Sequence, residues 1–241
     1  MKTILLSLCS LLTLAAAAQT VVSKTYPVKA GETVELAFDY PKLVRVSTWD
    51  KNEVSVVAKV SINGGQNDDA FTLEEGRTNG TVSVRNKIQN MDKLPRRYTV
   101  IDGGKKTVFA TKEAYGEYKK SASGSATMYS EGVDMEITVE VKVPATASTA
   151  IKATYGMVEL VNFNGAATVD APYGGIDATV VKATTGKLQA TTSYGQIYSN
   201  LELKPTEKTE KDFFTSITAE PGKGSMYILK STYGKIYLRK P

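Results

Sequence analysis

The sequence predicts an all-β protein whose second half is a stack of short, repeated strands. Apolar and polar residues alternate with a period of two along most of the chain, which is typical of strands with one buried face. The core Tyr-Gly-x-[Val/Ile] recurs four times between residues 151 and 238. A helical period is found only at 110–120 once the first 18 residues are set aside. We therefore expect a β-rich N-terminal region at 19–131 and a short β-solenoid at 132–241.

The first 18 residues have the pattern of a secretory signal peptide. A positive start is followed by an apolar run at 4–14 and by Ala16-Ala17-Ala18, which matches the small-x-small cleavage signature. The run is shorter than the roughly 20 residues that a helix needs to span a membrane. We therefore expect cleavage after Ala18, no transmembrane segment in the mature chain, and export to the periplasm, the outer-membrane surface or the extracellular space.

Residues 19–131 have the alternation of strands but no repeat. Alternating runs on either side of residues 50–52 predict a hairpin, and Asn79-Gly80 is a strong two-residue hairpin signal. Beyond this region, residues 137–143 form another clean alternation, which ends at Pro144. Strands are therefore expected on both sides of residue 132.

Segment 93–120 interrupts this pattern with eight basic residues against three acidic ones. Its Arg96, Arg97, Lys105 and Lys106 are candidates for a surface that binds anionic partners such as acidic polysaccharide or lipid headgroups. The alternative is a solvated insertion between strands. Nucleic acid is not an expected partner, because the chain is predicted to be exported and lacks interleaved aromatic and basic residues.

Four aligned segments form the repeat of the second half. Small or aliphatic residues alternate with polar ones before and after a glycine, and the phase of the alternation shifts at that glycine. The repeated pairs are Tyr155-Gly156, Tyr173-Gly174, Tyr194-Gly195 and Tyr233-Gly234. Each glycine is expected to mark a turn or bulge with positive φ. An antiparallel sandwich would also alternate, but it would not so readily place the same residues in the same columns four times.

The gap before the last repeat is about twice as long as the others. It contains the charged stretch KPTEKTEK at 204–211, which predicts an excursion loop. Residues 212–219 offer the alternative of one degenerate coil.

Two sets of tyrosines are candidates for ligand contact. The parity of the repeated tyrosine matches the inward columns, which predicts a stacked aromatic ladder at a corner of the fold. The alternative is a row of exposed rings that offer flat surfaces to sugars. Tyr198 and Tyr237 fall in an outward column on two coils and are therefore the better candidates for stacking on sugar rings.

Composition removes most catalytic classes. The 241 residues include no His and one Cys, Cys9, so imidazole bases, thiol nucleophiles, His or Cys metal sites and disulfides are excluded from the mature chain. Glu159 and Asp177 fall in one outward column, about 5 Å apart if stacked in register, a spacing that suits a retaining glycosidase, but solvated side chains are expected there. The segment 64–71 half-matches a calcium-binding nonapeptide and occurs once. We expect no catalytic residues, no cofactor and no metal.

The run VEVKVPATASTAIKATYGMVELVNFNG, the Tyr-Gly-x-Ile coils and the final STYGKIYLRK resemble the bacterial "putative adhesin" β-strand-repeat proteins, which are exported and common in Bacteroidetes. The opening at 24–56 also resembles the entry of such proteins. The resemblance implies a right-handed β-solenoid-like fold and no catalytic residues.

The sequence therefore predicts an exported, non-enzymatic, adhesin-like protein that binds or scaffolds at the bacterial cell envelope. Polysaccharide or a surface protein is the expected class of partner. A polysaccharide-acting lyase or hydrolase, or a structural envelope protein without a ligand, are the alternatives.

Overall fold

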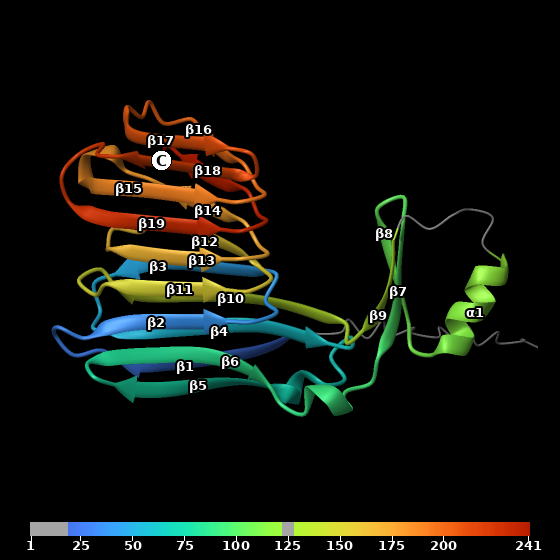
Figure 1. Ribbon diagram of the computed structural model, residues 1–241. Coiled ribbons are helices and arrows are strands. Elements are labelled where there is room, and N and C mark those ends of the chain that lie inside the picture. Colours follow the sequence, from blue (N-terminus) through green and yellow to red (C-terminus); the bar gives the residue numbers. More distant parts are fainter. Residues whose placement is uncertain (1–18, 122–127) are drawn as a thin grey trace, which may run out of the picture.

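The computed structural model describes residues 19–121 and 128–241, so the predicted signal peptide at 1–18 lies outside the described residues. Two large sheets pack against each other over a continuous hydrophobic core, and a small third sheet with one helix extends from one side (Figure 1). The all-β prediction is confirmed in this part of the chain, and α1 (Lys112–Ser121) lies where the helical period was found. Across the described ranges, no helix is both long enough and apolar enough to cross a membrane.

Hydrogen bonding between neighbours sets the spatial order of the strands in each sheet. The first sheet contains, in that order, β1 (Thr20–Pro27), β4 (Glu53–Ile62), β10 (Met135–Pro144), β3 (Leu43–Trp49), β12 (Met157–Leu160), β14 (Ile176–Thr179), β20 (Ile236–Arg239) and β16 (Ile197–Ser199). The second contains β17 (Pro205–Lys211), β18 (Phe214–Ala219), β15 (Thr185–Thr192), β19 (Ser225–Ser231), β13 (Ala167–Ala171), β11 (Thr149–Ala153), β2 (Thr33–Phe38), β6 (Thr81–Ile88) and β5 (Phe71–Thr78). The third contains β8 (Lys105–Phe109), β7 (Arg97–Asp102) and β9 (Met128–Gly132). Short 3₁₀ turns lie at Asp68–Ala70, Met91–Lys93 and Lys182–Thr184.

Each coil of the stack consists of one strand of the second sheet, which we call the forward strand, followed by one strand of the first sheet. Equivalent strands of neighbouring coils pair in parallel. In spatial order these coils are β2–β3, β11–β12, β13–β14, β19–β20 and β15–β16. The parallel register aligns one buried column along the forward strands, which consists of Leu36, Ile151, Val169, Leu229 and Ala190. The period-two pattern therefore places aliphatic side chains between the sheets, where burial of each large one contributes about 1.5–3 kcal/mol.

The coil formed by β19 and β20 lies out of chain order. Figure 1 shows the red β19 between the gold β13 and the orange β15, and β20 lies between β14 and β16 in the first sheet. Two contacts fix this position: the Tyr227 hydroxyl donates to the Phe163 carbonyl at 2.5 Å, and Arg239 Nε donates to the Asp177 carboxylate at 2.7 and 2.8 Å. The stack therefore differs from a solenoid wound in chain order.

The gap between Gly195 and Gly234 contains an antiparallel hairpin. β17 pairs with β18, and β18 pairs antiparallel with β15. The loop expected at 204–211 and the degenerate coil at 212–219 are both wrong, because these residues extend the second sheet as two further strands. The first sheet ends at β16, the partner of β15 in the last coil, and among the described strands none lies beyond it.

The N-terminal half also contributes to the stack. The hairpin predicted around residues 50–52 is wrong, because β10 lies between β3 and β4, parallel to the first and antiparallel to the second. The hairpin at Asn79-Gly80 is confirmed, with φ of 50° and 76° joining β5 to β6. β2 and β3 form a first coil, in which Pro41-Lys42 occupies the position of the repeated glycine. Each of the two large sheets contains strands from before and after residue 132.

The repeated glycines are required for close stacking, and the expectation of positive φ is wrong. None of the four has a positive φ. A Cβ on Gly174 would overlap the carbonyl oxygen of Gly156, and one on Gly234 would overlap that of Gly174. In the β19–β20 coil, the Ser231 hydroxyl accepts from the Gly234 N–H at 2.8 Å and donates to the Gly174 carbonyl at 2.9 Å. Only a residue without a side chain lets successive turns approach this closely.

Candidate functional site

An aromatic ladder runs along one edge of the stack, at the turns that join the two sheets. Neighbouring tyrosine rings are stacked with interplanar angles between 5° and 23°, and the last ring, Phe213, is tilted by 37°. The centroid distances are 5.8 Å for Tyr40–Tyr155, 5.5 Å for Tyr155–Tyr173, 5.4 Å for Tyr173–Tyr233, 5.1 Å for Tyr233–Tyr194 and 5.5 Å for Tyr194–Phe213. The predicted ladder is present, and it includes two rings that the repeat did not contain.

The inward orientation expected for this ladder is wrong. The four repeated tyrosines are 55–59% exposed. The strands β11 and β13 end at Ala153 and Ala171, two residues before the tyrosine, so the alternation no longer sets the direction of its side chain. The rings cover one another's faces and present their edges to solvent. Only the terminal rings, Tyr40 and Phe213, have a neighbouring ladder ring on a single side.

The Phe213 end of the ladder opens into a groove of about 400 Å³, which we call the end groove. It lies between the turn at 193–196 and the tip of the β17–β18 hairpin. Its aromatic lining consists of Tyr194, Tyr233, Phe213 and Phe214, and its charged and amide lining of Gln196, Glu210, Lys211 and Lys235. Phe213 is 72% exposed and has a φ of 60°, so the hairpin presents this ring to solvent from a left-handed backbone.

Tyr198 and Tyr237 lie next to the end groove, on the outer face of β16 and β20. Their rings are stacked at 5.3 Å, and Lys235 Nζ and the Arg239 guanidinium lie 5.8 Å and 5.0 Å from the centroids of Tyr198 and Tyr237 respectively. A second groove of about 290 Å³, lined by Tyr198, continues from β16 toward the hairpin and shares Gln196 with the first. The outward column that the sequence predicted is therefore beside a concave surface.

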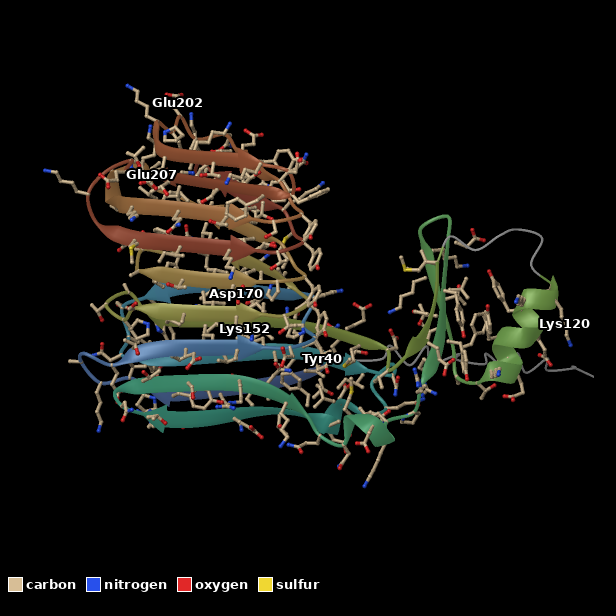
Figure 2. All side chains as sticks on the ribbon, in the orientation of Figure 1. Tyr40, Lys120, Lys152, Asp170, Glu202 and Glu207 are labelled. Carbon is tan, nitrogen blue, oxygen red and sulfur yellow. The ribbon has the colours of Figure 1, made fainter. Side chains whose placement is uncertain are left out.

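The Tyr40 end of the ladder meets a different groove, of about 430 Å³, at the junction with the third sheet (Figure 2). Here Lys106 is bound by Asp134 at 2.6 Å and by Glu136 at 2.8 Å, and Glu136 also binds Lys42 at 2.6 Å. Burial lowers the pKa of Lys106, but hydrogen bonds to the two carboxylates outweigh it and raise that pKa overall. The hydrogen bonds from Lys106 and Lys42 hold the pKa of Glu136 below its usual value. The network ties the third sheet to the body.

The basic segment contributes β7, β8 and most of α1, and together with β9 these elements contain an aromatic cluster. Tyr115 stacks on Tyr98 and Tyr129 at 5.9 Å and 4.8 Å. The four predicted basic residues do not gather into one free patch: Lys106 is neutralised by its two acids, Arg96 pairs with Glu131 at 3.4 Å, and Arg97 donates to Gln66 at 2.5 Å. Lys105 forms no ion pair among the described residues.

The two predicted sets of site residues are not brought together. β20 and β16 close the first sheet at one end, whereas the basic residues lie in or directly before the third sheet, which leaves the body beside β10 (Figure 1).

The outward acids of the stack are held by arginines. Glu159 and Asp177 are in register on β12 and β14, as the repeat predicted. Glu159 binds Arg45 at 2.8 Å, and Asp177 binds Arg239 at 2.7 Å. Each carboxylate therefore has a cationic partner on a neighbouring strand. Within residues 19–121 and 128–241, no cluster of three or more His, Cys, Asp or Glu side chains could hold a metal ion.

Comparison with known proteins gives one distant structural likeness. No family model and no curated protein sequence matches this chain. The fold is similar to a crystal structure described as a "putative cell adhesion protein" from Clostridium sporogenes, with 10% sequence identity and a TM-score of 0.47. The match covers 92% of this chain and 100% of that chain.

Proposed function

We propose that this chain is an exported, non-enzymatic, adhesin-like β-repeat protein that binds polysaccharide at the bacterial cell envelope. In this proposal the stacked coils act as a β-solenoid, a rigid support that holds a line of binding groups at fixed spacing. The observation that carries the proposal is the exposed aromatic ladder, which connects two grooves along one edge of the stack.

The exposed rings at that edge are not part of the buried core, which is formed by other, mostly aliphatic side chains. Tyrosine combines an apolar ring with a hydroxyl that donates and accepts hydrogen bonds, which suits recognition of sugars with both apolar faces and hydroxyl groups. The grooves at the ends of the ladder add amide, hydroxyl and charged side chains, the few convergent polar groups that fix the orientation of a ligand.

A binding role is favoured over catalysis by the state of the acids. The two in-register carboxylates are each paired with an arginine, so neither is placed as a free general acid opposite a nucleophile.

Retention of the purified protein on immobilised neutral and acidic polysaccharides tests this function, with released oligosaccharide measured in the same tubes. We expect retention without release. The variant Tyr194→Ser/Tyr233→Ser should weaken retention at least tenfold. The control Tyr129→Ser removes an exposed tyrosine outside the ladder and should retain wild-type binding. Released oligosaccharide would overturn the non-enzymatic assignment, and absence of retention on every polymer would overturn polysaccharide binding. Fractionation of the native cells tests export separately.

A further inference from the structure

The conformation of Phe213 is unexpected for a residue that serves the fold alone. It is the second residue of the two-residue connection between β17 and β18, and its φ is 60°. A left-handed backbone at this place in a turn favours glycine or asparagine, and a side chain such as phenylalanine there costs about 1 kcal/mol or more. With the ring 72% exposed, little burial offsets that cost. The hairpin therefore maintains an aromatic ring in solvent at the expense of a relaxed turn.

The position of this ring in the ladder leaves one of its faces without an aromatic neighbour. Phe213 touches Tyr194 on one side, at 5.5 Å and 37°, whereas the interior rings have a neighbour on each side. A free aromatic face beside a polar groove matches the apolar face of a pyranose ring, which buries C–H groups while its hydroxyls remain available for hydrogen bonds.

The charges of the end groove are unequal. Glu210 is bound by Lys208 at 2.8 Å, and this hydrogen bond lowers the pKa of Glu210, so its charge is already compensated. Lys211 and Lys235 also line the groove, and neither forms an ion pair with the residues that the structure describes. The groove therefore carries two cationic groups whose charge is not balanced locally, which favours an anionic ligand. At the opposite end of the ladder the cation of the groove, Lys106, is bound by two acids.

We propose that the end groove binds an acidic sugar unit of a polysaccharide, with Phe213 packed on the sugar ring and Lys211 and Lys235 bound to its carboxylate or sulfate. This inference rests on the proposed function and names the ligand class and the place of recognition. Lysine binds either anion as a point charge, so carboxylated and sulfated polymers are separate arms of the test.

Binding of the purified protein to polygalacturonate, dextran sulfate and uncharged dextran, measured by calorimetry at low and high salt, tests the inference. We expect at least tenfold tighter binding to one or both anionic polymers than to dextran, with affinity falling as salt increases. Lys211→Gln/Lys235→Gln should remove this preference. The control Lys119→Gln/Lys120→Gln changes the net charge equally on α1, away from the groove, and should stay within twofold of the wild type (Figure 2).

Phe213→Gly separates recognition from folding. Glycine relaxes the left-handed turn, so we expect an unchanged or higher unfolding midpoint together with at least tenfold weaker binding. A lower midpoint with intact binding would make Phe213 a cap on Tyr194 and overturn the inference. Equal binding to all three polymers, or wild-type binding by the double lysine variant, would also overturn it while leaving polysaccharide binding in place. Binding to none of a full polysaccharide panel would overturn both proposals.

Discussion

Gly234→Ala should lower the free energy of unfolding by about 3 kcal/mol. A Cβ at this position would overlap the carbonyl oxygen of Gly174 and lie 2.8 Å from the amide nitrogen of Gly175, whereas ordinary contacts of a Cβ begin near 3.4 Å. The contacted atoms are backbone atoms of the turn that joins β13 to β14, so no flexible side chain can give way. The coil also has Gly195 on its other side, where a shift of Gly234 would disturb a second close contact.

The sign of this effect is the informative part. None of the repeated glycines has a positive φ, so alanine is permitted by the backbone and would ordinarily stabilise the protein by about 0.4–1 kcal/mol through the unfolded state. Urea unfolding followed by circular dichroism measures the change, and with a slope of about 3 kcal/mol per molar the midpoint should fall by about 1 M.

Gly132→Ala is the matched control, because a Cβ there meets nothing within 4 Å. We expect its midpoint to stay within experimental error of the wild type or to rise slightly. Wild-type stability of Gly234→Ala would refute the close-stacking explanation, and an equal loss in both variants would show that the glycines act through chain flexibility.

Three further predictions concern the buried Tyr227 and two residues at the junction with the third sheet, Glu136 and Lys106. Tyr227→Phe should cost about 1 kcal/mol at neutral pH, because the Phe163 carbonyl loses its donor. Burial raises the pKa of Tyr227 from 10.0 to about 12, so its contribution to stability is complete below pH 10 and is lost as pH rises toward 12; urea titrations from pH 8 to 11 should show a smaller loss in the phenylalanine variant. The pKa of Glu136 lies below 4.5 in the folded state, so its contribution to stability is present above pH 4.5 and is lost as pH falls through the lower folded value. Glu136→Gln should therefore reduce the change of melting temperature with pH between pH 3 and 6. Lys106→Met should speed hydrogen exchange at 97–109 and leave the body unchanged, and uniform acceleration in both parts would contradict a local junction role.

The strands and the ladder were predictable because they rest on local patterns. Period-two alternation identifies a strand without reference to its partner. A tyrosine at the same position of four repeated segments predicts one ring at the same place on each coil, so that the rings stack. The coil of β2 and β3 was missed because Pro41-Lys42 replaces the glycine on which the segments were aligned. Tyr40, which follows an alternating run, was the signal that could have found it.

The order of the coils was not predictable from the repeat, because similar segments are equally good neighbours in a parallel sheet. The outward charges carry part of the missing information. Lys152 pairs in register with Asp170, which pairs in turn with Lys230, so opposite charges alternate along the outer face of the second sheet (Figure 2). In chain order Asp170 would instead lie beside Thr191.

The end groove could not be predicted from the sequence, for a related reason. Phe213 belongs to no repeat, and the segment before it is highly charged. The loop predicted for that segment therefore gave no indication of where the Phe213 ring lies. The pair Phe213-Phe214, between the charged run at 204–211 and the Thr- and Ser-containing residues 215–218, was the available signal. Pairing of β18 with β15 brings that turn to the end of the ladder.

The inserted coil has a consequence for the timing of folding. Among the described strands, β15 and β16 are linked by strand pairing to the preceding coils only through β19 and β20, which follow them in the chain. As the chain emerges from a ribosome, residues 185–192 can pair with β18 of the hairpin, but residues 185–199 find no neighbour in the preceding coils until residues 225–239 have also emerged. The stack therefore closes late and through contacts distant in sequence, which slows folding and leaves the growing chain open for longer than coils added one after another would.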